Sequence, residues 1–317
     1  MNQVIAPFLI ATGLIVVPLA ASGQTFAVGE LTTSSDTEGF RAKSAGVGLG
    51  FYTSKENVYD RLAYRKDLKD YSGTGFSTRA YGDTLFAARQ FSTGSGMFKT
   101  EGEISRVRVG SYGLHTLGAV QISGTIPGAV NYEARFEKNL VESVASLARG
   151  VTYSAYTLAA DYEVTPRFVL AGVAGRFNFS DGNDRPLARA KAIYVVSEDL
   201  GLSVYASGRR YSDSQPYTGN YFSPDEYQDY RGGLKVRRRV GALNGMLSAN
   251  FEAGQQNVDG AKSPVRAWEV RLESFPNRPW RYDLSLGLST SAGVSTNLTG
   301  RDYEYRYARA SVVWPFQ

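Results

Sequence analysis

Residues 280–289 read WRYDLSLGLS, and residues 305–316, beyond a polar loop, read YRYARASVVWPF. In both segments apolar side chains occupy every second position, and charged or small polar side chains lie between them. A period of two places the two sets on opposite faces of a β-strand. An apolar face with aromatic residues at its end, backed by a charged face, is typical of the membrane-spanning strands of an outer-membrane barrel. A half-buried strand of a soluble β-sandwich has the same alternation, so the rest of the chain must distinguish the two.

The composition indicates strands and turns. The 317 residues include 34 Gly, 21 Tyr and 16 Phe but only three Met. Cysteine is absent, which is compatible with any compartment and is common in exported barrels. The net charge of +5 is spread along the chain, and no basic cluster indicates a nucleic-acid partner.

Residues 1–24 differ in character from the remainder and predict a cleaved signal peptide. The run from Val4 to Ala20 is uncharged, and the small residues that follow it suit cleavage near Gln24. The run is short for a transmembrane helix and contains two prolines. An uncleaved anchor is the alternative, because no Lys or Arg precedes the run. The predicted domains are therefore a signal peptide over 1–24 and a barrel over 25–317.

The remaining chain divides into alternating segments joined by polar connections. The predicted strands are 25–32, 44–53, 58–67, 76–91, 98–110, 113–124, 129–137, 149–163, 167–179, 186–196, 201–211, 225–238, 242–254, 264–274 and the two quoted above. Long predicted connections (Glu137–Ala148, Ser180–Arg185, Ser212–Pro224, Gln255–Ser263 and Ser291–Asp302) alternate with tight turns. This alternation favours an all-β, antiparallel up-and-down transmembrane barrel of about 16 strands, with 14 as the alternative.

The same period predicts which side chains face the lumen. The candidates are Arg176, Arg189, Lys191, Tyr205, Arg209, Lys235, Arg237, Glu269, Arg271, Arg281, Asp283, Tyr305, Tyr307 and Arg309. Burying so many charges in a dry core would be very costly, so we expect a water-filled interior and hence a channel. Between residues 186 and 238 the basic lumen candidates outnumber the acidic ones, which favours an anionic or neutral substrate. The alternative is that these charged side chains only keep the lumen hydrated and pair with neighbouring acids, without acting on a substrate.

Two short motifs suggest a family. The first is Ser180, Asp181, Gly182 and Asn183 with Arg185, and the second is Tyr221, Phe222, Ser223 and Pro224. In this order they resemble the porin domain of the exopolysaccharide export outer-membrane proteins. The nearest is the poly-N-acetylglucosamine export porin, and the cellulose export barrel is more distant. The resemblance covers about residues 130–316. Asp181-Gly182-Asn183 is also ordinary turn chemistry, which leaves a coincidental match open.

The resemblance implies a passive conduit for a polysaccharide. It also implies a separate periplasmic scaffold, because family members usually carry a helical-repeat domain before the barrel and this sequence contains no such repeat. Further expected partners are outer-membrane lipid, inner-membrane synthesis machinery and the barrel-assembly machinery, and the barrel is expected to be a monomer. The chain departs from the family at Gln317, where an aromatic residue is usual. The alternatives are a small-solute diffusion or uptake porin and a non-conducting structural or adhesive barrel.

Catalytic and cofactor chemistry is not indicated. His115 is the single histidine, and a hydrolase would need a nucleophile and an orienting group beside it. The sequence has no metal-ligand spacing and no phosphate-binding glycine loop. We therefore predict a non-enzymatic protein without a metal or cofactor. Tyr and Arg side chains suit a sugar polymer, because both offer flat stacking surfaces and hydrogen-bond donors.

Overall fold

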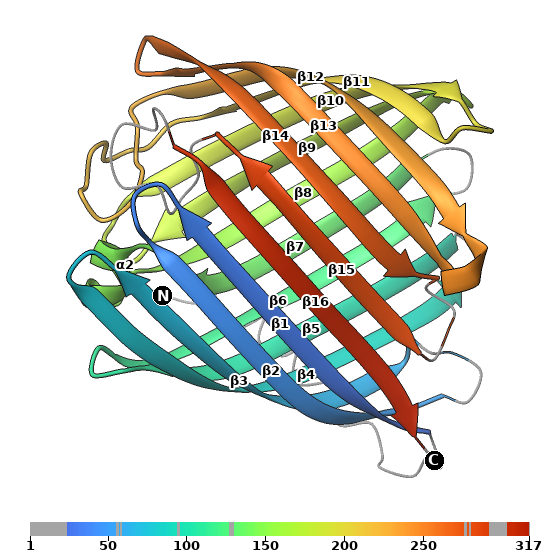
Figure 1. The fold of residues 1–317 in the computed structure, drawn as a ribbon, viewed down its shortest axis with the longest axis horizontal. Helices are drawn as coiled ribbons and strands as arrows, with labels where there is room; N and C mark the ends of the chain where they lie inside the picture. Colours follow the sequence, from blue (N-terminus) through green and yellow to red (C-terminus); the bar gives the residue numbers. More distant parts are fainter. Residues whose placement is uncertain are drawn as a thin grey trace, which may run out of the picture.

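The computed structural model describes residues 24–54, 57, 59–93, 96–126, 130–275, 278, 280–291 and 303–316. These residues form one closed antiparallel barrel of sixteen strands, which confirms the predicted fold class and strand number (Figure 1). The predicted signal peptide lies outside the described residues except for Gln24, and so does nearly all of the predicted loop Ser291–Asp302.

The strands follow one another around the barrel in chain order. They are β1 (Thr25–Asp36), β2 (Arg41–Tyr52), β3 (Arg61–Gly73), β4 (Phe76–Thr93), β5 (Gly96–Val109), β6 (Gly113–Ile126), β7 (Val130–Leu140), β8 (Thr152–Thr165), β9 (Phe168–Phe179), β10 (Asp184–Ser197), β11 (Leu202–Tyr211), β12 (Tyr227–Val240), β13 (Gly245–Val258), β14 (Ala261–Ser274), β15 (Arg281–Ser289) and β16 (Tyr305–Phe316). A short helix, α2 (Val144–Arg149), lies between β7 and β8, and a 3-10 turn (Gly241–Leu243) lies between β12 and β13.

The first and last strands close the sheet. β1 pairs with β16 along its whole length, from Thr25 opposite Phe316 to Asp36 opposite Tyr305. Every other strand pairs with its neighbours in sequence. A closed sheet leaves no edge of unpaired backbone groups, which is the condition for a β structure to cross a bilayer.

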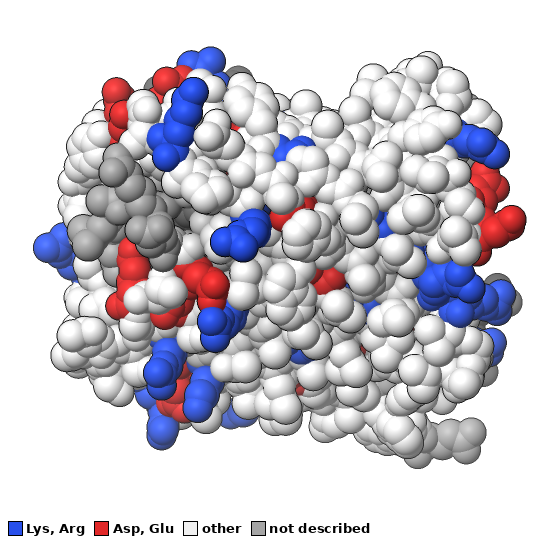
Figure 2. Space-filling view, turned by 45° about the horizontal axis from the view of Figure 1, so that its top comes forward, with Lys and Arg blue, Asp and Glu red and all other residues white. Residues whose placement is uncertain are grey.

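The outer surface carries a belt of exposed apolar side chains. Val47, Leu49 and Leu158 are each more than 60% exposed (68%, 62% and 65%), although each lies in the middle of a strand. Figure 2 shows charged side chains gathered toward the two ends of the barrel, with a mostly uncharged surface between them. Such a belt would be unfavourable in water and suits contact with lipid chains. The protein is therefore a β-barrel of the Gram-negative outer membrane.

Among the described residues, no helix has both the length and the apolar character needed to cross a bilayer.

The two ends of the barrel differ. Thr25 and Phe316 lie at one end, and α2 lies at the other (Figure 1). Helix α2 belongs to the connection 141–151, and the long connection 212–226 lies at the same end. Outer-membrane barrels have short periplasmic turns and longer extracellular loops. We therefore name the end with Thr25 and Phe316 the periplasmic end and the α2 end the extracellular end.

Two sequence predictions about connections are wrong. The predicted long loop Gln255–Ser263 is a two-residue turn, because β13 extends to Val258 and β14 starts at Ala261. Asp259 and Gly260 form this turn with φ of +50° and +84°, a conformation that Gly and Asp accept more readily than most residues. The first strand extends to Asp36 rather than 32, so the β1–β2 connection is also short. Polar composition at the end of a strand therefore does not distinguish a strand from a loop.

The lipid-facing belt yields a stability prediction. Leu286 lies in the outer face of β15, and Leu286→Arg would place a charge among lipid chains. We expect a loss of about 2–4 kcal/mol in the free energy of unfolding. Urea-dependent refolding into lipid vesicles, followed by tryptophan fluorescence, measures it. Ser285→Arg on the inner face is the matched control and should change stability by much less. Equal losses would contradict the assignment of the two faces.

Candidate functional site: the barrel interior

The inner face carries nearly all of the predicted lumen residues. Strand alternation places Arg189, Lys191, Tyr205, Arg209, Lys235, Arg237, Glu269, Arg271, Arg281, Asp283, Tyr305, Tyr307 and Arg309 opposite the exposed apolar set. Contacts between strands agree with this placement. The Lys191 ammonium lies 3.4 Å from the Tyr205 ring centroid. The Arg271 guanidinium donates bidentate hydrogen bonds of 2.6 and 3.0 Å to the Asp283 carboxylate.

Arg176 is the exception, and its predicted lumen position is wrong. It lies between Tyr156 and Pro186 in the register of the sheet, on the outer face of β9 with Leu170. Its guanidinium binds the Asp184 carboxylate near the extracellular end, where the Arg176 side chain is 63% exposed. Its charge suggested the lumen, but the strand period places it outside, above the apolar belt.

The connection 141–151 folds into the barrel. The Glu142 carboxylate accepts hydrogen bonds from Lys69 (3.2 Å) and Tyr71 (2.9 Å), both on the inner face of β3. Three strands lie between β3 and β7, and four lie between β3 and β8, so the contact crosses the interior. Leu147 of α2 is buried in an apolar cluster with inner-face residues of β3 to β6, Tyr71, Ala80, Val109 and Leu117 among them. We call residues 141–151 the inner segment.

Local sequence chemistry defines the ends of α2. The Ser143 side chain caps the helix by accepting from the Ser146 amide at 3.1 Å, and Gly150 ends it with φ of +66°. The predicted polar connection Glu137–Ala148 is thus partly strand and partly helix, since β7 continues to Leu140.

The β9–β10 turn is joined to the β11–β12 connection by a buried ion pair. The Arg185 guanidinium lies 2.9–3.1 Å from both carboxylate oxygens of Asp213, and the two side chains are 4% and 0% exposed. Arg185 also donates to the Phe222 carbonyl at 2.5 Å and lies over the Tyr211 ring at 4.6 Å. Burial raises the pKa of the Asp213 carboxyl to about 6, while Arg185 opposes this shift. At neutral pH the carboxyl is therefore mainly ionised and pairs with Arg185.

The other residues of both motifs meet around this ion pair. The Asn183 side chain donates to Asp213 (2.9 Å) and Tyr221 (3.1 Å), and the Tyr221 hydroxyl donates to Asp181 (3.1 Å). The Tyr221 ring stacks on Phe179 with 4.4 Å between centroids. Gly182 has φ of +92°, and a side chain there would be strained. Burial of the Tyr221 hydroxyl beside Asp181 raises its pKa well above the ordinary value.

Ser180, Ser223 and Pro224 hold the backbone around these contacts. Ser180 Oγ accepts from the Thr152 amide at 3.0 Å, and Ser223 Oγ accepts from the Thr218 amide at 3.0 Å. The Pro224 carbonyl accepts from the Asp213 amide at 3.2 Å.

The β11–β12 connection in turn binds the inner segment. The Asn220 carbonyl accepts from Ser143 Oγ (2.5 Å) and Ser146 Oγ (2.8 Å), and Arg149 donates to the Asn220 side chain. The Asn220 amide group donates to Asp181 at 2.9 Å. We call this set the latch; its residues are Ser143, Ser146, Asp181, Asn183, Arg185, Asp213, Asn220 and Tyr221. The sequence motifs indicated four of these residues, but nothing in the sequence signalled Ser143, Ser146, Asp213 or Asn220 as their partners.

A cavity of about 500 Å³ lies beside the inner segment. Glu142, Lys69 and Tyr71 border it on one side, and β14, β15, β16, β1 and β2 form the rest of its wall. Tyr305, Tyr307, Arg271 and Arg309, all predicted lumen residues, line it. The cavity therefore combines aromatic rings with charges of both signs.

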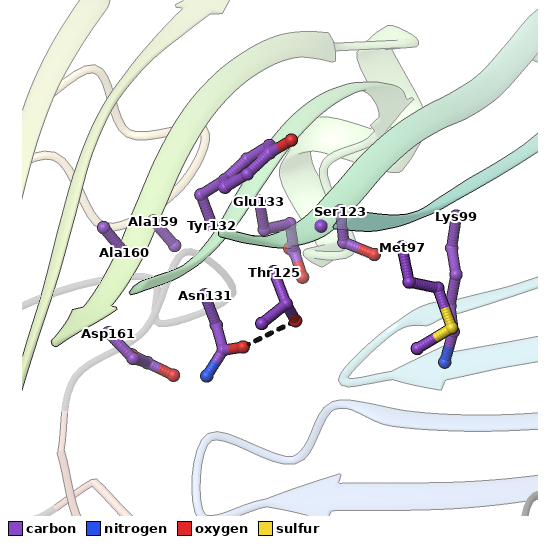
Figure 3. Close-up of a pocket in the computed structure, with 11 residues that line it drawn as sticks. Met97, Lys99, Ser123, Thr125, Asn131, Tyr132, Glu133, Ala159, Ala160 and Asp161 are labelled. Carbon is purple, nitrogen blue, oxygen red and sulfur yellow. Dashed lines mark hydrogen bonds between the residues drawn. The ribbon is translucent and has the colours of Figure 1, made fainter. Parts of the chain in front are cut away.

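A smaller cavity of about 280 Å³ lies toward the periplasmic end. Figure 3 shows Met97, Lys99 and Ser123 on one side of it and Asn131 and Asp161 on the other. Asn131 accepts a hydrogen bond from Thr125 at 2.8 Å.

Charge is unevenly distributed around the inner face. On β10–β12, which the structure describes in full, the inner face carries the basic residues Arg185, Arg189, Lys191, Arg209, Arg231, Lys235, Arg237 and Arg239. Asp229 is the one acidic residue on that face, and it pairs with Arg209 (2.6 Å) and Arg231 (2.8 Å). The inner face of β5–β8 is instead acidic, with Glu101, Glu103, Glu133, Glu137, Asp161 and Glu163 against Lys99 and Arg135.

Four basic residues of the β10–β12 face have no acidic partner among the described residues, and one of them, Arg239, lies over the Phe275 ring at 4.8 Å. No described carboxylate lies within 4 Å of Arg189, Lys191 or Lys235. We call these three the basic track. The expected excess of lumen cations in this part of the chain is therefore present in the structure.

Within the described ranges, no three His, Asp or Glu side chains lie close enough to hold a metal ion. His115 lies on the inner face of β6 beside Gly150, and its Nε2 atom has no hydrogen-bond partner among the described residues.

Comparison with known proteins supports the architecture. No protein-family model matches the sequence, and no curated protein matches it either. The chain is similar in structure to one described as "Bacterial polysaccharide outer membrane secretin", with a TM-score of 0.66 and 12% identity over 94% of this chain and 100% of that one. At this identity the likeness extends to the fold.

Two further structures overlap less well. CdiB from Acinetobacter baumannii has a TM-score of 0.45 and 11% identity over 92% of this chain and 60% of its own. OccK10 (OpdN) of Pseudomonas aeruginosa has a TM-score of 0.43 and 12% identity over 94% of this chain and 100% of its own.

The latch yields a prediction about Arg185. Arg185→Met would leave the Asp213 charge buried without its partner, which costs about 3–5 kcal/mol. We expect the connection 212–226 to become cleavable by protease under conditions in which the wild type resists. Limited proteolysis with mass spectrometry of the fragments measures this. Arg210→Met is the control, because its pair with Glu226 is exposed and contributes little. Equal protection of the Arg185 variant and wild type would argue against the latch.

Proposed function

We propose that the chain forms an outer-membrane channel that passes an exopolysaccharide to the cell surface. The observation that carries the proposal is the lining of the 500 Å³ cavity, where Tyr71, Tyr305 and Tyr307 lie with Arg271 and Arg309. Sugar rings stack on aromatic faces, and their hydroxyls bind guanidinium and carboxylate groups. A polymer can exchange such contacts step by step while it moves.

The basic track supports an anionic or neutral polymer over a cationic one. Arg189, Lys191 and Lys235 have no carboxylate partner among the described residues, so their charges are free to act on a substrate. In a confined passage, unpaired charge of one sign concentrates substrates of the opposite sign. Tyr205 lies against Lys191 and adds a ring surface to the track.

The fold comparison is compatible with this role. The similar barrel with a TM-score of 0.66 is described as a polysaccharide outer membrane secretin. In the proposed arrangement the barrel is passive, and inner-membrane synthesis machinery with a separate periplasmic scaffold delivers the polymer. Insertion would depend on the barrel-assembly machinery.

Deletion of the gene is the first test. We expect polymer to disappear from the cell surface while it accumulates or is degraded in the periplasm. Quantification of polymer in the two compartments measures this, with plasmid-borne wild type as the control. Unchanged surface polymer together with altered uptake of small solutes would exclude export.

A matched pair of triple variants tests the basic track. Arg189→Gln with Lys191→Gln and Lys235→Gln removes the three charges of the basic track. For an anionic polymer we expect surface export to fall by about tenfold, because electrostatic enrichment is lost. The control removes three outer-face charges through Arg176→Gln, Arg210→Gln and Arg306→Gln, and its export should equal the wild type. Equal export by both variants would show that the lumen charges do not act on the polymer.

A small-solute diffusion porin is the second candidate, and the inner segment favours it. Porins of that class narrow the lumen with an inward loop, and residues 141–151 fold inward to reach β3. Replacement of Val144–Arg149 by a short Gly-Ser linker should raise single-channel conductance in planar bilayers several-fold, because the narrowing is lost. Ser-to-Gly replacement at Ser291, in the β15–β16 connection, serves as the control. A diffusion porin would also admit small sugars faster after this replacement.

A further inference from the structure

The outer face of β2–β5 changes abruptly from apolar to basic toward the extracellular end. Val47, Leu49, Leu85 and Ile104 belong to the apolar belt and are all exposed. Beyond them, on the same outer face, lie Arg41, Lys43, Lys66, Asp70, Arg79, Asp83, Arg106 and Arg108. We call this set the basic patch.

The register of the sheet arranges the patch in rows across the four strands. Lys43 is opposite Asp70, which is opposite Arg79. Four residues further along β3, beyond a row in which Leu68 is opposite Tyr81 and Tyr81 is opposite Arg108, Lys66 is opposite Asp83, which is opposite Arg106. Directly opposed side chains on one face are about 5 Å apart at Cβ, and diagonal neighbours are about 7–8 Å apart. A single ligand of several charged groups can therefore reach most of the patch.

The patch has an excess of positive charge. Asp83 pairs with Lys66 at 3.7 Å, and Asp70 pairs with Arg79 at 2.6 Å. Arg41, Lys43, Arg106 and Arg108 are all exposed. No described carboxylate lies within 4 Å of any of these four. Six cations against two acids leave four unpaired positive charges.

Some other outer-face cations near this end are paired with acids, whereas Lys138 and Lys262 have no carboxylate within 4 Å among the described residues. Arg176 pairs with Asp184, Arg210 with Glu226 at 2.6 Å, and Arg306 with Glu304 at 2.5 Å. The basic patch differs from the rest of this end because four unpaired cations lie together on the neighbouring strands β2–β5.

We propose that the basic patch binds a phosphorylated glycolipid of the outer leaflet. The ligand must have anionic groups directly above lipid chains, because the unpaired cations lie directly above the apolar belt. Acyl chains would lie along Val47, Leu49 and Leu85, and phosphates would meet Arg106, Arg108 and Lys43. Arginine binds phosphate with two parallel hydrogen bonds, which are among the stronger polar contacts. Contact with lipid also lowers the dielectric around each pair and strengthens it.

The test compares two lipids on the purified full-length chain in detergent. Lipid A with two phosphates is titrated by native mass spectrometry, beside the same lipid after enzymatic removal of both phosphates. We expect the phosphorylated lipid to bind at least about tenfold more tightly, with an affinity that falls as salt increases. Equal binding of the two lipids by the wild type would overturn the proposal without any variant.

Variants locate the site. Arg41→Gln, Lys43→Gln, Arg106→Gln and Arg108→Gln together should remove the preference for the phosphorylated lipid and leave binding of the dephosphorylated lipid unchanged. The triple variant Arg176→Gln, Arg210→Gln and Arg306→Gln is the control and should keep the preference. Heat-dependent gel migration checks that both variants fold as barrels. A preference retained by the quadruple variant would place the phosphate site elsewhere and overturn the assignment.

Discussion

Inside a bilayer every backbone amide and carbonyl must find its partner within the protein, and the rest of this structure depends on that constraint. Pairing of β1 with β16 along the whole of β1 satisfies it. Once the sheet is closed, the pleat divides every strand into a lipid face and an inner face. The apolar belt and the charged interior are two consequences of one hydrogen-bond pattern.

Closure also dictates how the interior must be stabilised. Side chains of opposite sign meet across neighbouring strands, as Asp229 does with Arg209 and Arg231. In a water-filled barrel the remaining charges would be screened, so an unpaired Arg189 or Lys235 would cost far less than in a dry core. Because these inner-face charges need no partner, the inner face of β10–β12 can be mainly basic while the inner face of β5–β8 is mainly acidic.

Much of this architecture can be read from the sequence because a period of two is a local signal. It yields sixteen strands and places all but one of the proposed lumen residues correctly. Arg176 is the exception, because β9 continues beyond the lipid to a position where an outward-facing charge pairs with Asp184. The latch could not be derived in this way. Its two motifs are visible, but contacts such as Ser143 with Asn220 join residues 77 positions apart, and no local pattern encodes them.

The inner segment is held from two sides, and this determines what kind of passage the barrel can contain. Leu147 is buried against the wall of β3 to β6, and Ser143 and Ser146 are fully buried against Asn220 of the latch. A segment anchored at both sides acts as part of the wall, so the distance from Glu142 to the wall of β14–β16 is set by packing. A passage of fixed width selects through the chemistry of its lining. Because that lining is basic on one side and acidic on another, a substrate's charge determines which wall it follows.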